Sequence, residues 1–311
     1  MDRPRPCGCK GRRSCLICEE EYALNNQSNF INKENNTYVY CPYCNKAWPG
    51  WNIYDYKIHP NHEGSPIVYP GVYVDLNFLS KCEEKYLMDN IDSMPWSPSQ
   101  SGRRKQNFGP KCNLKKRKLN IGEFNGFPQF SQFIQKKFIS VPILDGFQTI
   151  EQCSLEYNPD RGASIDPHID DCWVWGERIV TVNLLADAVL TMTINSKHER
   201  YNLDCVKTYP SVLDSNGNKN TTGESYCLKS NEKDVSVIRI PMPRKSLLVM
   251  YGSARYDWEH QVLREDILER RVCLAYREFT PPYLKHGEKY EEAREILIRA
   301  KRFCDIKDFT S

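Results

Sequence analysis

A chain that carries His168-Ile169-Asp170 and, further on, His260 can join these side chains at one point only if distant strands become neighbours. Residues two apart on an extended segment point to the same side, so His168 and Asp170 can bind one ion. His260 follows the apolar run 247–251, and we expect it at a strand-to-strand turn. Two imidazoles and one carboxylate leave three octahedral positions open, as in non-haem Fe(II) oxygenases. Six histidines leave few other triads available.

Arg271 and Arg277 follow His260 closely and are candidates for holding a dicarboxylic co-substrate such as 2-oxoglutarate. A guanidinium can grip a carboxylate through paired hydrogen bonds. The two arginines share a strand face, but six residues at about 3.3 Å each separate them by roughly 20 Å, which exceeds the length of 2-oxoglutarate. Arg271 is therefore expected to bind the distal carboxylate. Arg277 either acts at the other end of the site or forms a structural salt bridge.

The composition limits where such a chain works. Lys and Arg number 43 against 40 Asp and Glu, so charge alone does not indicate a nucleic-acid-binding protein. No apolar run reaches the roughly 18 residues of a membrane helix, so no membrane partner is expected. Residues 1–7 lack the apolar core of a signal peptide, and fourteen cysteines then favour metal ligands and buried thiols over disulfides. We expect a cytoplasmic and nuclear protein.

Six of the cysteines lie within the first 44 residues, and residues 1–62 are expected to form a small Cys-rich module that binds zinc on its own. The pairs Cys15-x2-Cys18 and Cys41-x2-Cys44 are typical of one tetrahedral zinc site and favour zinc over an iron–sulfur cluster. Two further cysteines exceed a four-ligand site. They either join His59-x2-His62 in a second site or form one site with the first pair. The set under this second alternative is Cys7, Cys9, Cys15 and Cys18.

The rest of the chain changes from helical to β patterning near residue 147. Apolar spacing predicts a helix over 75–94, with Asp75 as N-cap, and a short helix over 127–138. Val-, Ile- and Thr-rich segments then alternate with turn residues, which is typical of a double-sheet jelly roll. The predicted strands are 147–157, 178–185, 188–194, 234–240, 245–251 and 271–279.

These elements define the expected architecture: a mainly β (α+β) fold with flanking helices and a Cys-rich module at the N-terminus. Residues 63–146 form a helical extension, 147–283 the β core, and 284–311 a C-terminal helix centred on 288–303. The polar excursion 195–233 is expected to be a surface hairpin or loop.

Several blocks resemble the AlkB dioxygenases: Cys153–Pro159, Asp166–Asp170, Trp258–His260 and Arg271–Arg277. The segments Cys7–Gly11, Cys15–Glu19 and Asp170–Arg178 are similar to one branch of that family, AlkB homologue 4. The likeness runs from Cys7 to about Tyr283.

The resemblance implies a double-stranded β-helix that uses Fe(II), 2-oxoglutarate and O2 for oxidative N-demethylation with release of formaldehyde. It also implies that Tyr157 contacts 2-oxoglutarate. Two positions depart from the family pattern. Leu155 stands where many relatives carry asparagine, and Cys273 stands where some do.

In the same family, the segment between the N-terminal helix and the β core forms a lid over the substrate. Here that segment holds eight cationic residues in the sixteen positions 103–118. They are suited to phosphates, to an acidic protein surface, or simply to solvent. The lid residues expected to matter are Arg103, Arg104, Lys105, Lys115, Lys116, Arg117 and Lys118.

Three hypotheses remain for what the protein acts on or does. The AlkB homologue 4 resemblance favours monomethylated lysine in a protein such as actin, with a role in actomyosin regulation and a place at the midbody or contractile ring. The basic segment permits demethylation of DNA or RNA bases such as N6-methyladenine. A non-catalytic, zinc-dependent interaction protein is the third hypothesis, and the intact His168/Asp170/His260 set argues against it.

Overall fold

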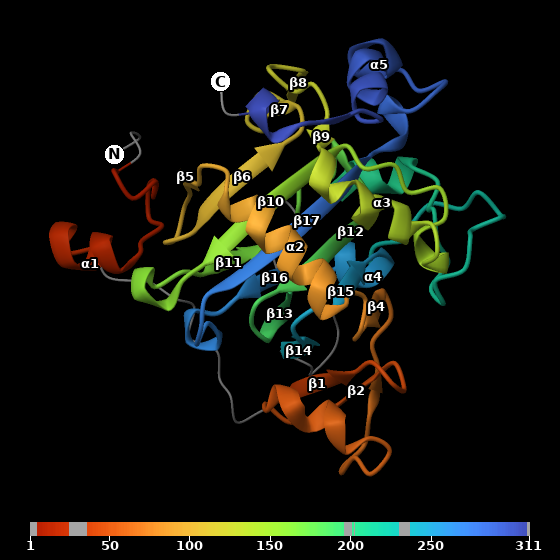
Figure 1. Ribbon diagram of the computed structural model, residues 1–311. Coiled ribbons are helices and arrows are strands. Elements are labelled where there is room, and N and C mark those ends of the chain that lie inside the picture. The colour runs from red at the N-terminus through yellow and green to blue at the C-terminus, as the bar shows by residue number, and fades with distance from the viewer. Residues whose placement is uncertain (1–4, 25–35, 196–200, 202, 230–236, 310–311) are drawn as a thin grey trace.

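The computed structural model describes residues 5–24, 36–195, 201, 203–229 and 237–309, and two seven-stranded sheets form its centre (Figure 1). The first sheet has the order β11 (Ile165–His168), β16 (Trp258–Val262), β13 (Ala188–Ile194), β14 (Val237–Met242), β1 (Thr37–Cys41), β2 (Lys46–Pro49) and β3 (Ile67–Val68). The second has the order β4 (Val72–Asp75), β15 (Leu247–Met250), β12 (Trp175–Leu184), β17 (Arg271–Phe279), β10 (Glu151–Tyr157), β6 (Arg104–Phe108) and β5 (Ser97–Pro98).

A shared core joins the two sheets. One cluster of buried apolar side chains includes Met192 and Ile238 from the first sheet and Ile179 and Cys273 from the second. The predicted double-stranded β-helix, mainly β with flanking helices, is confirmed.

Short elements surround the sheets. The helices are α1 (Leu16–Tyr22), α2 (Lys81–Asp92), α3 (Gln132–Phe138), α4 (Gly252–Tyr256) and α5 (Tyr290–Arg299). The 3-10 turns are η1 (Ile53–Ile58), η2 (Gln129–Ser131), η3 (Pro142–Leu144), η4 (Pro159–Arg161), η6 (Leu203–Thr208), η7 (Arg264–Asp266), η8 (Pro281–Tyr283) and η9 (Ile306–Phe309). Two small ribbons pair β7 (Lys111–Asn113) with β8 (Lys118–Asn120), and β9 (Phe127–Pro128) with β18 (Phe303–Cys304). Among the described residues, no helix has the length and apolar character needed to cross a bilayer.

Helix α2 begins later than the sequence predicts. Residues 72–75 pair with β15, so Asp75 ends a strand and does not cap the helix. The N-cap is Ser80, whose hydroxyl accepts from the Glu83 amide at 3.2 Å, while the Glu83 carboxylate accepts from the Ser80 amide at 2.7 Å. This capping box supplies a local start signal that the apolar spacing does not reveal. Figure 1 shows α2 lying across the second sheet.

Long-range pairing also shortens the other predicted helices. Residues 127–128 pair with 303–304 in a parallel ribbon, so α3 starts only at Gln132 and α5 ends at Arg299. The strands over 188–194 and 271–279 match their predictions, and the others differ by a few residues at their ends. Residues 234–236 of one predicted strand lie outside the described residues.

The N-terminal region does not stand apart from the core. Strand β1 pairs in parallel with β14, so residues 37–68 extend the first sheet by three strands. The boundary expected at residue 62 therefore falls inside the sheet, between β2 and β3. Likewise, the predicted helical extension 63–146 contributes β4, β5 and β6 to the second sheet. A fragment of residues 1–62 would lack the strand on which β1 rests.

The described part of the polar excursion packs on the core. Its residues Leu203 and Val206 are buried with Ile169, Cys172 and Tyr256. The Glu177 carboxylate anchors it by accepting from the Ser211 hydroxyl at 3.0 Å and from the Val212 amide. The expected surface hairpin thus covers the chain segment that follows His168.

Candidate active site and cysteine groups

The three predicted iron ligands meet at the edge of the first sheet. His168 on β11 lies directly opposite His260 on β16, and their ring centroids are 4.1 Å apart. One ligand atom from each histidine and one from Asp170 all lie within 4.8 Å of one another. His260 sits inside strand β16, where the sequence analysis expected a turn. Adjacent edge strands therefore bring the distant histidine to the H-x-D motif.

The surroundings prepare these groups to bind a cation. Nδ1 of His168 lies 2.8 Å from the Asp166 carbonyl oxygen, so it carries the proton and leaves Nε2 free as the ligand atom. Burial lowers the pKa of both histidines, which keeps the imidazoles neutral. Burial opposes ionisation of Asp170, but the Arg277 guanidinium overcomes it and holds the pKa of that carboxyl well below its usual range. The donor set fits Fe(II).

Arg277 is occupied by carboxylates of the protein itself. Its Nε and Nη2 each lie 3.2 Å from an oxygen of Asp170, and its Nη1 donates to Glu151. Of the two roles left open by the sequence, the structure thus places Arg277 in an ion pair with Asp170, one of the three predicted iron ligands. Its guanidinium fixes the orientation and charge of Asp170 and has no free edge for 2-oxoglutarate.

Arg271 is instead a buried cation without a carboxylate partner among the described residues. It is 2% exposed, and its Nε donates to the Asn183 side-chain oxygen at 2.7 Å. Its Nη1 has no hydrogen-bond partner within this part of the chain. Tyr157 lies opposite Arg271 in the sheet register, with the guanidinium 4.7 Å from its ring centre. A buried, unsatisfied guanidinium is costly unless a ligand pairs with it, so this corner fits the distal carboxylate of 2-oxoglutarate.

Two further residues contribute to this site without a motif to mark them in the sequence. Asn183 lies opposite Cys273, one of the positions that departs from the family pattern, and its amide orients Arg271 from the neighbouring strand. Its signal was that Asn183, with Asp187, interrupts the apolar run 179–194. Glu151, opposite Arg277 on β10, is the second and had no motif to mark it.

The expected lid is divided between two different structures. Arg104 lies on β6 and pairs with Glu156 of β10 at 2.5 and 2.7 Å, and Lys105 on the same strand is exposed. The Arg103 guanidinium stands 5.9 Å from the Tyr157 ring. The four cations from Lys115 to Lys118 are exposed in the β7–β8 hairpin. Arg104 and Lys105, from the first half of the predicted lid, therefore belong to strand β6, where the Arg104 guanidinium neutralises the buried Glu156 carboxylate.

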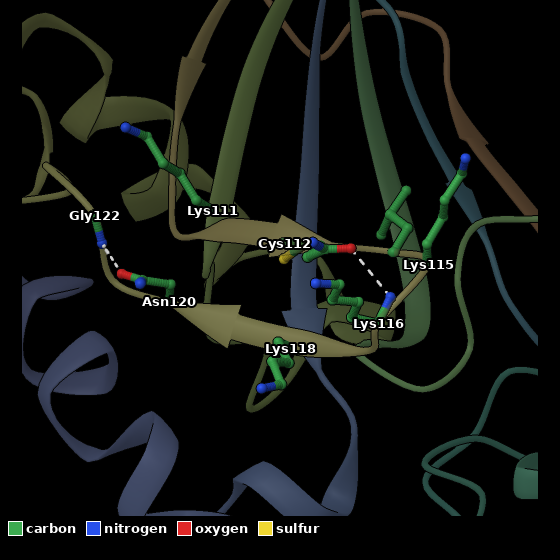
Figure 2. Close-up of a pocket in the computed structure, with 9 residues that line it drawn as sticks. Lys111, Cys112, Lys115, Lys116, Lys118, Asn120 and Gly122 are labelled. Carbon is green, nitrogen blue, oxygen red and sulfur yellow. Dashed lines mark hydrogen bonds between the residues drawn. The ribbon is translucent and has the colours of Figure 1, made fainter. Parts of the chain in front are cut away.

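The β7–β8 hairpin borders a surface hollow of about 790 Å³. Figure 2 shows that the ammonium groups of Lys111, Lys115 and Lys118 point in different directions and do not converge on one point. The Arg117 charge opposes the burial that raises the pKa of Asp171, the residue after Asp170. The exposed lysines of the hairpin form a diffuse positive surface.

Replacing Glu156 with glutamine should destabilise the fold in a pH-dependent way. Its side chain is 1% exposed, and hydrogen bonds from Arg104, Arg161 and Arg270 outweigh burial to lower its pKa to about 2. This stabilisation is complete above the unfolded pKa near 4.5 and disappears as pH falls towards 2. Urea unfolding of Glu156→Gln should show a loss of about 3 kcal/mol at pH 7, shrinking towards pH 2. Glu123→Gln, at a 95% exposed residue, is the control and should change little; equal losses at pH 7 and pH 3 would contradict the assignment.

The N-terminal cysteines form two separate groups. Cys7, Cys9, Cys15 and Cys18 bring their sulfurs together, whereas Cys41 and Cys44 join His59 and His62. In each group the ligand atoms lie within 4.8 Å of one another. The expected site made of both Cys-x2-Cys pairs is therefore wrong, because α1 docks beside β11 while Cys41 and Cys44 flank the turn of the β1–β2 hairpin (Figure 1). The alternative with four cysteines before residue 19 has the geometry seen here.

Both groups have the chemistry of metal sites. Arg5 Nε donates to the Cys18 sulfur at 3.1 Å, and Trp48 Nε1 donates to the Cys44 sulfur at 3.4 Å. Nε2 of His62 is buried and has no partner within the described residues. Tetrahedral sites of four cysteines, or of two cysteines and two histidines, are typical of structural zinc.

Comparisons with known proteins extend this picture. No protein-family model matches the chain. It is 38% identical over 297 residues to alpha-ketoglutarate-dependent dioxygenase alkB homolog 4 of Mus musculus, covering 96% of this chain and 94% of that protein. The Homo sapiens protein of the same name is 36% identical over 299 residues, with the same coverage. A Caenorhabditis elegans protein named DNA N6-methyl adenine demethylase is 31% identical over 309 residues, covering 94% and 93%. The likeness spans nearly the whole chain, well beyond the metal-ligand motif.

Proposed function

Because the chain belongs to the AlkB family of 2-oxoglutarate-dependent dioxygenases and is such an enzyme, we propose that it removes methyl groups from lysine side chains of a protein. The family implies Fe(II), 2-oxoglutarate and O2 as cofactor and co-substrates. Iron with these co-substrates supplies the power to oxidise an N-methyl carbon, after which formaldehyde leaves and the amine is restored.

The described residues divide the work of binding between them. His168, Asp170 and His260 would hold iron, and Arg277 would keep Asp170 ionised. Arg271, oriented by Asn183 and beside Tyr157, would grip the distal carboxylate of 2-oxoglutarate. Apart from Asp170, which follows β11, these groups sit on strands of two packed sheets, so they are positioned before the ligands arrive.

The arrangement of cations is the observation that carries the choice of a protein substrate. Arg104 is neutralised by Glu156, and the hairpin ammonium groups diverge, so these cations of the described chain form no row along a phosphate backbone. The net charge of +3 adds little long-range attraction for nucleic acid. A diffuse positive surface suits an acidic patch on a protein. Actin carrying monomethylated lysine is the substrate that the resemblance to AlkB homologue 4 favours.

Demethylation of N6-methyladenine is the second candidate. The Caenorhabditis elegans relative is named for that activity. The consecutive cations from Lys115 to Lys118 are exposed on the hairpin, where they are accessible to the phosphates of a nucleic-acid strand. A purely non-catalytic role is disfavoured by the assembled iron ligands.

We also propose zinc as the ion of both cysteine groups. Thiolates prefer zinc to the hard divalent cations, and the iron site offers no sulfur ligand. Elemental analysis of the full chain should therefore find two zinc ions that are independent of iron loading. Zinc below one ion per chain after loading would refute this proposal.

Formaldehyde release is the decisive measurement for the substrate. Wild-type enzyme with Fe(II) and 2-oxoglutarate should release formaldehyde from actin monomethylated at lysine and leave N6-methyladenine in an oligonucleotide unchanged. Asp170→Asn serves as the background for both substrates. Release from the oligonucleotide alone would reverse the choice between the two candidates.

Neutralising the cations of the β7–β8 hairpin should weaken binding of the protein substrate and leave turnover of 2-oxoglutarate unchanged. Changing Lys115, Lys116, Arg117 and Lys118 together to glutamine should raise KM for methylated actin about tenfold or more, because each exposed cation near an acidic surface contributes up to about 1 kcal/mol. Turnover of 2-oxoglutarate without substrate should not change. Lys85→Gln, on the exposed face of α2, is the matched control. If oligonucleotide affinity is tight and falls by about one log unit per contact for each log unit of salt, nucleic acid is the partner.

A further inference from the structure

The four-cysteine group docks against the rim of the iron site. Three of its members, Cys9, Cys15 and Cys18, are fully buried, although the segment 5–24 has few apolar residues of its own. Cys7 and Cys18 sulfurs lie 3.3 Å apart, and those of Cys15 and Cys18 lie 3.8 Å apart. Helix α1 is only seven residues long. Such a segment cannot stabilise itself by burial alone, so its shape depends on what joins the sulfurs.

Three contacts fasten this segment to the catalytic core. Arg13 Nε lies 3.0 Å from the Asp166 carboxylate. Glu19 accepts two hydrogen bonds from Arg264, at 2.7 and 2.9 Å, and both side chains are about three-quarters buried. Gly8, at φ +91°, packs against Ser99, where a Cβ atom would stand 2.8 Å from the backbone nitrogen.

Two of these positions, Asp166 and Arg264, adjoin the two histidines proposed to bind iron. Asp166 also accepts the hydrogen bond from His168 Nδ1 through its carbonyl oxygen. Arg264 follows strand β16, which carries His260. Strand β11 lies at the sheet edge, and its pairing with β16 shifts register between Ile165 and His168. The ladder alone therefore holds His168 weakly, and the docked segment supplies a second support.

We propose that a zinc ion in the four-cysteine group tethers β11 and β16 and thereby sets the affinity of the iron site. The ion fixes the fold of residues 5–24, and that fold holds Arg13 on Asp166 and Glu19 on Arg264. Loss of the ion releases both contacts and leaves His168 on an irregular edge strand. This inference rests on the proposed iron and zinc sites and assigns the four cysteines a positioning role.

The second cysteine group provides an internal control. Cys41, Cys44, His59 and His62 surround the hairpin of β1 and β2, which are separated from β11 and β16 by β13 and β14. The described residues show no contact between this group and the iron ligands. Its zinc should therefore support the sheet edge without affecting iron.

The test compares three variants of the full chain loaded with zinc. Cys15→Ser/Cys18→Ser removes the proposed tether, and Cys41→Ser/Cys44→Ser removes the other zinc. Arg13→Gln/Glu19→Gln keeps every ligand and cuts the docking contacts. Anaerobic titration with Fe(II) in the presence of 2-oxoglutarate follows the visible charge-transfer band of the chelate and gives the iron Kd. Elemental analysis reports zinc.

We expect the first variant to lose one zinc and to bind Fe(II) about ten- to a hundredfold more weakly, the range found when supporting contacts of metal ligands are removed. The second should lose one zinc and keep the iron Kd within about twofold. The third should keep both zinc ions and weaken iron as the first does, which decides the matter if the cysteine variant does not fold.

An unchanged iron Kd in the Arg13→Gln/Glu19→Gln protein, or equal weakening in both cysteine variants, would overturn the tether. A wild-type chain that develops no band would instead refute the iron site itself. The two failures are therefore distinguishable.

Discussion

Asp170→Asn should reduce formaldehyde release by roughly a thousandfold or more, which corresponds to about 4 kcal/mol of transition-state stabilisation. The amide keeps the shape of the side chain but not the charge that binds iron. Arg277 keeps its contact with Glu151 and can still donate to the amide oxygen. Enzyme loaded with Fe(II) and 2-oxoglutarate is the sample, and fluorescence detection of formaldehyde is the readout. Asp171→Asn, which lies outside the ligand group, should retain turnover.

Asp170→Ala should add a loss of stability to the loss of activity. Removing one partner of a buried ion pair costs about 3–5 kcal/mol, and Asp170 faces Arg277 with both oxygens. Thermal unfolding without metal should therefore separate alanine from asparagine at this position. If the asparagine variant kept its turnover, Asp170 would not be an iron ligand.

Arg271→Ala should weaken 2-oxoglutarate binding by about 30- to several-thousandfold, because truncating one partner of a buried charged pair costs about 2–5 kcal/mol. The unsatisfied Nη1 and the 2% exposure of this residue support the upper part of that range. Calorimetric titration of the Mn(II)-loaded protein with 2-oxoglutarate measures the change.

Arg271→Lys is the matched variant for this position. It keeps the charge and loses the fork, so its affinity should lie between wild type and alanine. The rise in melting temperature that 2-oxoglutarate produces should vanish in Arg271→Ala and persist in part in the lysine variant. Equal affinity in all three proteins would move the anchor to another residue, with Arg103 beside Tyr157 as the next candidate.

Local patterns were enough to predict six strands of the β core to within a few residues, and to select His168, Asp170 and His260, which the fold brings together. The strand over 271–279 is buried along most of its length and is bounded by turn residues, so its ends are readable. The two-residue spacing of His168 and Asp170 keeps their side chains close, although strand β11 ends at His168 and Asp170 follows it. Both predictions depend on short stretches of chain.

Features that depend on distant partners were not readable. The start of α2 moved because residues 72–75 pair with β15, and α5 ended early because residues 303–304 pair with 127–128. Arg104, expected in the basic lid, instead forms an ion pair with Glu156, 52 residues later in the chain. Which cysteines share a group depends on where α1 docks on the core, and the spacing of cysteines along the chain does not show that docking.

The parallel pairing of β1 with β14 also has a consequence for how the chain matures. Thr37 lies beside Val237, about 200 residues later, so β1 leaves the ribosome long before its neighbour exists. A parallel partner cannot be supplied by a tight turn, and an unpaired strand edge is an aggregation hazard. The hairpin of β1 and β2, with Cys41 and Cys44 at its turn, can form before β14 has been synthesised. We therefore expect polypeptides truncated before residue 237 to need chaperones, and early metal loading to protect the nascent chain.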